Sequence, residues 1–254
     1  MPSLSTPAIM LRRIEFGDFD YIITFFTLNQ GIVSVIAKSA KKSTKRFSGI
    51  LELFSVLDIV YGSGLGKGLP LLKEAVLKQP FSKIRADIKK TAYASYWAEL
   101  INAWMEEREK QSKLYYLFRS VLGELDLGHM PDTVLSILFQ MRFMTISGHS
   151  PNLRQCSLCK KQLEEIKKAD IIFDLTKGGL VCENCCQNIS KRITLSKGTI
   201  KQLLWIDQGD LAKAKRIRFT PQALNEGLTF LEAFVPFHLG KEPKSLKFLR
   251  QIRT

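Results

Sequence analysis

Residues 156–185 decide how this sequence is interpreted, because CSLC at 156–159 is followed 22 residues later by CENC at 182–185. A two-residue gap lets both thiolates of a pair face one ion, and two pairs complete a tetrahedral shell of four sulfurs. The intervening residues predict a β-hairpin, with strands at 171–175 and 180–181 and a turn at 176–179. Such a ribbon is too small to bury a core. We therefore expect a structural zinc ion bound by Cys156, Cys159, Cys182 and Cys185.

Two other uses of these cysteines are a pair of disulfides and a redox-active C-x-x-C. The chain has only five cysteines, and its first ten residues lack the basic and apolar segments of a secretory signal. We therefore expect a reducing compartment, which disfavours disulfides. A shell of four thiolates has no open position, so the metal is expected to be structural and not catalytic. Cys186, next to the second pair, is a competing ligand.

The charge balance points to polyanionic partners. The 254 residues carry 38 Lys and Arg against 24 Asp and Glu, a formal net charge of +14. Such an excess favours nucleic acid, with an anionic membrane surface as the lesser option and a merely solvated surface as the alternative. No apolar run approaches the roughly 20 residues of a membrane span. We expect a soluble cytoplasmic protein without a membrane partner.

Residues 1–80 predict a small β-barrel. β-branched and aromatic residues favour strands at 8–11, 21–27, 32–37, 51–61 and 71–78. Turns are expected at 29–31 and at the glycine-rich segment 62–68. That segment lacks the GK[ST] ending of a phosphate-binding loop, so it is interpreted as a hairpin turn. Five short strands in about 80 residues are typical of an OB-fold.

Residues 81–254 predict a helical domain that the cysteine ribbon interrupts at 153–190. Apolar residues recur at helical spacing within 81–150, where the third helix is expected at 132–147 with Gly148 as its stop. Further helices are expected at 196–206 and 221–235, before a basic tail. The predicted fold class is therefore α+β, with an N-terminal OB-fold barrel, a helical domain and an inserted four-cysteine zinc ribbon.

Basic residues concentrate in three places. The first, expected to form a mobile loop at the barrel rim, contains Lys38, Lys41, Lys42, Lys45 and Arg46. The second contains Lys213, Lys215, Arg216 and Arg218. The third contains Lys241, Lys244, Lys247, Arg250 and Arg253. OB-type barrels bind single strands with a cationic groove and exposed aromatic rings. The candidate rings, of which only one or two can be free of the core, are Phe16, Phe19, Tyr21, Phe25 and Phe26.

No catalytic constellation is evident. The three histidines, His129, His149 and His238, are scattered along the chain, and no H-x-E motif accompanies the cysteines, so a zinc deaminase is disfavoured. We expect a binding protein and not an enzyme. From composition and spacing alone, a zinc-ribbon nucleic-acid-binding accessory protein of transcription or translation fits as well.

Three stretches resemble the RecO family of bacterial DNA repair and recombination mediators. They are IMLRRIEFGDFDYIITFFT with NQGIVSVIAKSAKK, then ISGHSPNLRQCSLC with FDLTKGGLVCENC, and FHLGKEPKSLKFL near the end. The chain departs from the family where Ser39 follows the Ala-Lys of the basic loop and where Lys160 follows the second cysteine, since glycine is common at both positions. The resemblance spans nearly the whole chain, and the order and spacing of the stretches make it specific.

The resemblance implies a function that composition does not. Family members bind single- and double-stranded DNA, anneal complementary strands, act with RecR, contact the acidic C-terminal tail of single-strand DNA-binding protein, and help load RecA. This implies a nucleoid-associated protein. By position, the family's basic barrel face corresponds to Arg12, Arg13, Lys38, Lys41, Lys42, Lys45 and Arg46. The family's zinc ligands correspond to the four paired cysteines. The candidates for secondary contacts with DNA or a partner are Lys213, Lys215, Arg216, Arg218, Lys244, Lys247 and Arg250.

Overall fold

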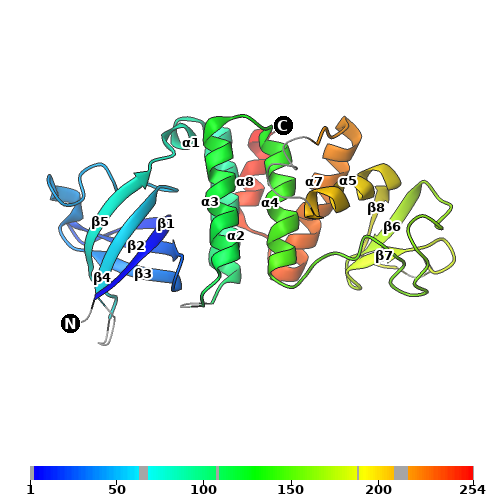
Figure 1. Ribbon diagram of the computed structural model, residues 1–254, viewed down its shortest axis with the longest axis horizontal. Coiled ribbons are helices and arrows are strands. Elements are labelled where there is room, and N and C mark those ends of the chain that lie inside the picture. The colour runs from blue at the N-terminus through cyan, green and yellow to red at the C-terminus, as the bar shows by residue number, and fades with distance from the viewer. Residues whose placement is uncertain (1–2, 63–67, 107–108, 188, 209–216, 254) are drawn as a thin grey trace. The chain divides into compact units, whose positions relative to one another are not determined.

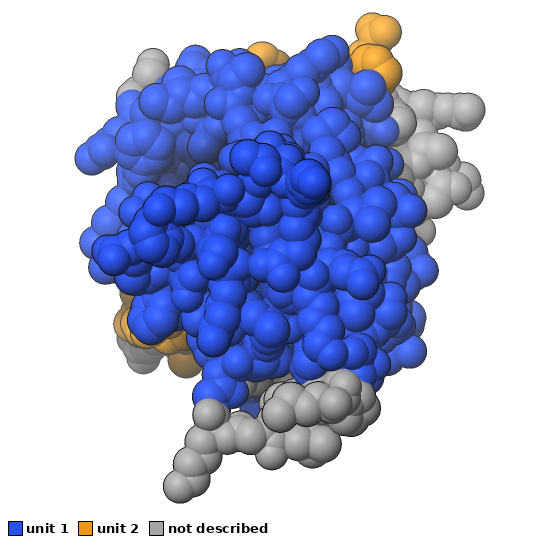
Figure 2. Space-filling model, turned by 90° about the vertical axis from the view of Figure 1, so that its left-hand side faces the viewer, with its two compact units in different colours: residues 1–127, 243–254 blue, residues 128–242 orange. Residues whose placement is uncertain are grey.

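The computed structural model describes residues 3–62, 68–106, 109–187, 189–208 and 217–253. The chain forms two compact units. Unit 1 contains residues 1–127 and 243–254, and unit 2 contains residues 128–242; they are blue and orange in Figure 2. None of the described helices combines the length and the apolar character that crossing a bilayer requires.

Unit 1 begins with a five-stranded barrel (Figure 1). Its strands are β1 (Ser3–Phe16), β2 (Asp20–Thr27), β3 (Gly31–Ala37), β4 (Val56–Gly62) and β5 (Leu72–Gln79), in the order β3-β2-β1-β4-β5. All neighbours in this order are antiparallel. A parallel bridge between Ile36 and Leu71 joins the two outer strands, and the Ile36 N–H donates to Pro70 O at 2.9 Å. This Greek-key topology confirms the predicted OB-fold.

Side-chain alternation gives the barrel two buried faces. Met10, Phe25 and Val35 point into a core that is closed to solvent. Residues of the opposite phase, such as Ile9 and Phe26, are equally buried. The ring of Phe26 lies 5.8 Å from that of Tyr115 on α3 (Ser112–Leu127). The outer face of β2 is therefore packed against a helix of the same unit at Phe26.

Two strands differ from their predicted bounds. β1 runs from residue 3 to residue 16 instead of 8–11, and it is irregular between Met10 and Arg12. The strand predicted at 51–61 begins only at Val56. Residues 51–55 form a loop, in which Phe54 is buried with a left-handed φ of 68° and donates its N–H to Met10 O. Alternation continues through this loop, so the pattern could not show where the strand begins. Residues 63–67 of the predicted glycine-rich turn lie outside the described residues.

The helices of unit 1 are α1 (Ser82–Ala86), α2 (Ile88–Trp104), α3 and α8 (Lys244–Arg253). The expected basic tail is thus a helix, which packs on α2 with Leu246 and Leu249 buried. Glu99 of α2 caps its first turn. The Glu99 carboxylate accepts hydrogen bonds from Lys244 N at 3.1 Å, from Ser245 N at 2.9 Å and from the Ser245 hydroxyl. A carboxylate at a helix N-terminus satisfies free N–H groups and complements the helix dipole.

Within its described residues, unit 2 combines three helices with the ribbon (β6, β7, β8 and both cysteine pairs). The helices are α4 (Asp132–Ile146), α5 (Lys197–Gln208) and α7 (Pro221–Leu239), and the strands are β6 (Asp170–Asp174), β7 (Gly179–Val181) and β8 (Arg192–Ser196). The predicted β6–β7 hairpin is confirmed, but β8 was not predicted and completes the order β7-β6-β8. The predicted stop at Gly148 is confirmed by its φ of 80° just beyond α4.

Aromatic packing and a partly buried cap join the ribbon to its helices. The ring of Phe173 on β6 lies 4.7 Å from that of Phe230 and 5.5 Å from that of Phe234, both on α7. Glu226 of α7 accepts hydrogen bonds from Ser196 N at 2.8 Å and from the Thr199 hydroxyl at 2.6 Å, where α5 begins. Burial acts to raise the pKa of Glu226, but these hydrogen bonds outweigh it and lower the pKa.

Candidate metal centre and nucleic-acid surface

The structure brings the four paired cysteines together. The sulfur atoms of Cys156, Cys159, Cys182 and Cys185 all lie within 4.8 Å of one another. Cys159 Sγ and Cys182 Sγ are 3.5 Å apart, well beyond the ~2.05 Å of a disulfide. Sulfurs around one zinc ion at ~2.3 Å would be about 3.8 Å apart. The cluster therefore fits a tetrahedral metal and not a pair of disulfides, and all five cysteines are free thiols.

The first cysteine pair lies on a tight turn. Lys160 N donates to Cys156 O at 3.0 Å, and Cys156 N donates to Lys161 O at 2.8 Å. Lys160 adopts a left-handed φ of 64°, a conformation that glycine adopts without strain. Cys182 N donates to Cys156 Sγ at 3.4 Å, so the two pairs are also joined directly.

The thiols of the cluster differ in pKa. Burial acts to raise the pKa of Cys156, but the backbone N–H groups of Cys159, Cys182 and Leu158 outweigh it and lower the pKa to about 6. Hydrogen bonding to Cys182 and Cys159 raises the pKa of Cys185 to about 12. A bound metal must displace the protons of these thiols.

One ion pair lies beside the cluster. Lys161 Nζ is 2.8 Å from Glu183 Oε1; Lys161 lies two residues after Cys159, and Glu183 directly follows Cys182. The hydrogen bond that Lys161 donates to Glu183 raises the pKa of Lys161, and the charges of Cys182 and Cys159 act in the same direction. This ammonium group partly offsets the negative charge that four thiolates would carry.

The spare cysteine is not a member of the cluster. Cys186 donates its thiol to Glu183 O at 3.2 Å and is absent from the group of four sulfurs, so it does not compete in this arrangement.

Gly179, at the start of β7, leaves no room for a side chain, because a Cβ there would lie 2.1 Å from Ser157 Oγ. Glycine at this position lets β7 pass directly beneath the first cysteine pair.

The basic loop (residues 38–46), which the sequence predicts to be mobile, makes several contacts with the β1–β2 turn. Ser39 N donates to Asp20 Oδ1 at 2.7 Å, and Lys41 N donates to Phe19 O at 3.0 Å. Lys41 Nζ lies 2.8 Å from Glu15 Oε2, and this hydrogen bond lowers the pKa of Glu15. Sequence reasoning missed Glu15 and Asp20, because these acids lie about 20 residues before the basic loop and meet it only in the fold.

Ser39 is the residue that lets the loop turn. Its φ is 55° and its ψ is 25°, in the left-handed region that favours glycine. The next three residues form the short helix η1 (Ala40–Lys42). The family's usual glycine and this chain's serine therefore serve the same backbone shape.

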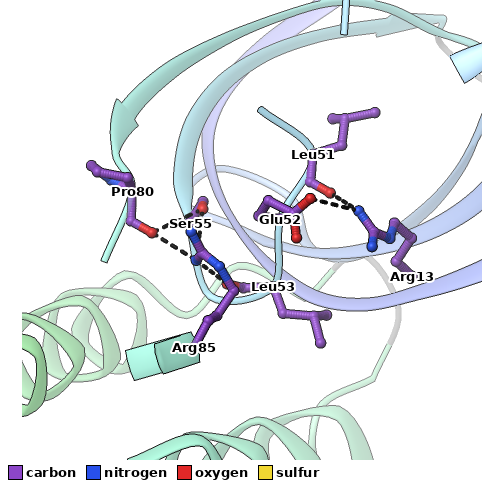
Figure 3. Close-up of polar contacts among 7 residues, drawn as sticks. All are labelled: Arg13, Leu51, Glu52, Leu53, Ser55, Pro80 and Arg85. Atoms are coloured by element: carbon purple, nitrogen blue, oxygen red, sulfur yellow. Dashed lines mark hydrogen bonds and ion pairs between the residues drawn. The ribbon is translucent and has the colours of Figure 1, made fainter. Parts of the chain in front are cut away.

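The seven candidate DNA-binding residues divide into two groups. Arg12, Lys38, Lys42, Lys45 and Arg46 are exposed, whereas Lys41 and Arg13 are partly buried in ion pairs. Arg13 Nη1 lies 3.1 Å from Glu52 Oε1 and also donates to Leu51 O. Figure 3 shows Arg13 and Arg85 reaching the segment 51–55. Arg13 therefore also holds the loop that connects the basic segment to β4.

Arg85 of α1 is the second support of this loop, and sequence reasoning gave it no role. Its Nη1 donates to Leu53 O at 2.9 Å and to Pro80 O at 2.8 Å (Figure 3). Nothing in its sequence neighbourhood distinguishes Arg85 from the other surface cations. Only the fold shows that it binds carbonyls at the end of the barrel.

The candidate aromatic residues also divide. Phe25 and Phe26 are fully buried. Tyr21 is partly buried, with the cationic groups of Arg13 and Lys41 at 4.9 Å and 5.8 Å from its ring centroid. Phe16 and Phe19, on either side of Gly17 and Asp18, are 51% and 41% exposed.

The other basic clusters lie elsewhere. Lys213, Lys215 and Arg216 fall outside the described residues, whereas Arg218 is described and exposed. Lys244, Lys247 and Arg250 lie on α8.

The histidines are less scattered than the sequence suggested: the rings of His149 and His238 pack edge to face at 5.3 Å. Each of these two rings contacts a backbone carbonyl, Ser147 O at 2.8 Å and Phe234 O at 3.0 Å respectively.

Comparison with known proteins identifies the family. Two family models match, "Recombination protein O N terminal" over residues 1–81 and "Recombination protein O C terminal" over residues 85–247. A DNA repair protein RecO from Desulfatibacillum aliphaticivorans is 48% identical over 100% of this chain and 98% of its own length. Those from Desulfosudis oleivorans and Syntrophus aciditrophicus are 44% and 32% identical, over 100% and 98% of this chain and 99% and 95% of their own lengths. The chain belongs to the RecO family of DNA repair proteins.

Proposed function

We propose that this chain is a recombination mediator that binds DNA on its barrel and anneals complementary strands. The observation that carries the proposal is the exposed row of cations at Lys38, Lys42, Lys45 and Arg46, held in place on the rim of an OB-fold. OB-folds bind single strands with such a cationic surface. The proposal includes no covalent chemistry, so the protein acts by binding and not as an enzyme.

Annealing on this surface has a simple physical basis. Two DNA strands repel each other through their phosphates, and cations that neutralise phosphates release condensed counterions. A loop already fixed in shape loses less conformational entropy when it binds than a loop that must first become ordered. Ser39, Lys41 and Phe19 supply that fixation through their contacts between the loop and the turn.

The partners follow from family membership as part of the same proposal. Acting with RecR, the protein helps load RecA onto single strands coated by single-strand DNA-binding protein, whose acidic tail it contacts. Exposed cations outside the barrel, Arg218 in unit 2 and Lys244 on α8, are candidates for that acidic tail or for further DNA contacts. Lys247 and Arg250 of α8 are further candidates for these contacts.

Zinc is proposed as the ion of the cysteine cluster, with the role of holding the ribbon together. Four thiolates suit zinc and leave it no position for a substrate. The four sulfurs are already gathered at distances that a tetrahedral ion requires. The test is direct: purified protein is expected to contain one zinc per chain by elemental analysis. A chain that is folded in the ribbon and free of metal would contradict this role.

The annealing proposal is tested with two complementary oligonucleotides across a salt series, with and without single-strand DNA-binding protein. We expect acceleration that weakens as salt rises and persists on coated strands. Alanine at Lys38, Lys42, Lys45 and Arg46 should flatten the plot of log binding constant against log salt by up to about 2.8, since each phosphate contributes about −0.7 on a single strand. Binding without annealing would contradict the mediator role.

Two control variants make this test specific. Alanine at Lys83 and Lys89, exposed cations outside the barrel, should leave the salt slope nearly unchanged. Glu15→Gln should strengthen DNA binding, in contrast to alanine at the loop cations, because it removes the acid that pairs with Lys41. We expect this variant to bind single strands a few-fold more tightly at low salt, with little change in stability.

A further inference from the structure

The β1–β2 turn presents two phenylalanine rings to solvent that the barrel core does not use. Phe16 ends β1 and pairs in register with Asp20, and Phe19 lies in the turn between them. Both rings are about half exposed, and neither belongs to the barrel's core cluster. An isolated exposed ring is ordinary on a protein surface. Two rings within four residues, beside a row of cations, are a more specific arrangement.

The backbone of this turn is fixed by the basic loop. Asp20 accepts the N–H of Ser39, Phe19 O accepts the N–H of Lys41, and Gly17 O accepts from Lys41 Nζ at 3.2 Å. These contacts place the two rings and the cations on one small structure. A ligand that needs both a flat apolar contact and a positive charge would find them without first ordering the chain.

A cation already contacts one of these rings. Lys42 Nζ lies 3.6 Å from the centroid of Phe19, within the range of a cation–π interaction. A nucleotide offers an aromatic base and an anionic phosphate joined by a sugar. Because the Lys42 ammonium lies over one face of Phe19, a base would stack on the opposite face of that ring or on Phe16, with its phosphate near the ammonium group.

We propose that Phe16 and Phe19 are a stacking platform for unpaired bases, with Lys42 as the adjoining phosphate contact, and that the platform makes the barrel favour single strands over duplex. This inference rests on the proposed DNA binding by the barrel. In a duplex, the bases are paired and stacked on each other, so only the phosphates remain available to the cations. The rings therefore add affinity for single strands alone.

The experiment compares single-stranded and duplex oligonucleotides of equal length, by fluorescence anisotropy at fixed salt, using the full chain. The double variant Phe16→Ala, Phe19→Ala should lose about tenfold or more in affinity for the single strand, since stacking contributes 1–3 kcal/mol per base. Its duplex affinity should remain within about twofold of the wild-type value. Its salt slope should be unchanged, because no charge is removed. Equal loss on both substrates, or no loss on either, would overturn the platform.

Three further variants separate the explanations. Phe16→Trp with Phe19→Trp keeps aromatic faces and should retain the preference for single strands. Phe16→Leu with Phe19→Leu keeps apolar volume without a ring, so it should lose the preference, and it serves also if the alanine variant folds poorly. Val76→Ala, at a residue of the same barrel that is 53% exposed, should behave as wild type.

Failure of the platform and failure of the proposed function give different results. If the unchanged protein binds neither substrate at low salt, DNA binding by the barrel is wrong. If the unchanged protein binds both, and the alanine variant binds the single strand equally well, only the platform is wrong. Lys42→Ala gives a third pattern, with weaker binding to both substrates and a flatter salt slope.

Discussion

The barrel and the ribbon solve the same stability problem in different ways. The barrel encloses a continuous apolar core, with Met10, Phe25 and Leu57 fully buried within it. The ribbon has three short strands and gathers four sulfur atoms instead. A small sheet excludes too little water to fold by the hydrophobic effect alone, so a metal is the usual substitute. Substitutions that leave a cavity should therefore destabilise the barrel, and chelators that remove a metal should destabilise the ribbon.

Loss of one sulfur ligand should have the largest effect. Cys182→Ala should abolish zinc binding and with it a stabilisation on the order of 10 kcal/mol. We expect amide hydrogen exchange to become fast across β6–β8, while the barrel keeps its protection and its DNA affinity. Cys186→Ala is the matched control, because that thiol lies outside the cluster, and it should retain the metal. Slow exchange in a metal-free Cys182→Ala ribbon would show that packing on α7 suffices.

The reciprocal change in the barrel should be the next largest. Phe25→Ala removes a fully buried ring and should destabilise unit 1 by about 3–5 kcal/mol through lost contacts and the cavity left behind. Denaturant unfolding measures the loss, and zinc content should stay at the wild-type level. If Phe25→Ala also released zinc, the barrel and the ribbon would not be independent in stability.

The two glutamates that cap helices allow a smaller and matched comparison. Glu226→Gln weakens the cap of α5 in unit 2, and Glu99→Gln weakens the cap of α8 in unit 1. Each should cost about 1 kcal/mol, localised by hydrogen exchange to its own helix.

For Glu226 the effect depends on pH. Its pKa is lowered in the folded chain, so its contribution is fully present above the unfolded pKa and is lost as pH falls through the folded pKa. The stability difference between wild type and Glu226→Gln should therefore shrink as the pH falls below about 4.3. A difference that stays constant down to pH 2 would contradict this assignment.

Replacing two residues of left-handed backbone conformation by glycine, one in each unit, should have the smallest effects on stability. Ser39 lies in the basic loop and Lys160 follows the first cysteine pair, and both have a positive φ. Glycine relieves the clash of the side chain there, although it also adds entropy to the unfolded chain. Ser39→Gly should stabilise unit 1, and Lys160→Gly the ribbon, by about 0.5–1 kcal/mol each, measured by thermal unfolding. Destabilisation by either glycine would mean that the side chain contributes contacts of its own.

The sequence predicted what depends on spacing and alternation. The gathering of the four cysteines follows from C-x-x-C geometry, and most strands of the barrel follow from period-two patterns ended by turns. Both survive tertiary folding because the same residues that set the pattern also form the core or the sulfur cluster. The ribbon hairpin was predicted for the same reason, since Gly178 and Gly179 mark its turn.

The remainder depends on contacts between residues far apart in sequence. β8 is short and mostly polar, so nothing local shows that it pairs with β6. The clamp on the basic loop requires Asp20 and Ser39 to meet across a barrel rim. Which phenylalanines are exposed depends on strand register, and periodicity did not distinguish Phe16 and Phe19 from Phe25 and Phe26.

The return of the chain to unit 1 has a consequence for biosynthesis. Helix α8 packs on α2 and receives its cap from Glu99, yet it follows the whole of residues 128–242 in the chain. A ribosome therefore produces the barrel and α2 long before the helix that covers α2. During that interval the surface destined for Leu246 and Leu249 stays open to water, and unit 2 can complete its own core first. Nascent chains stalled before residue 243 should accordingly bind hydrophobic chaperones through unit 1.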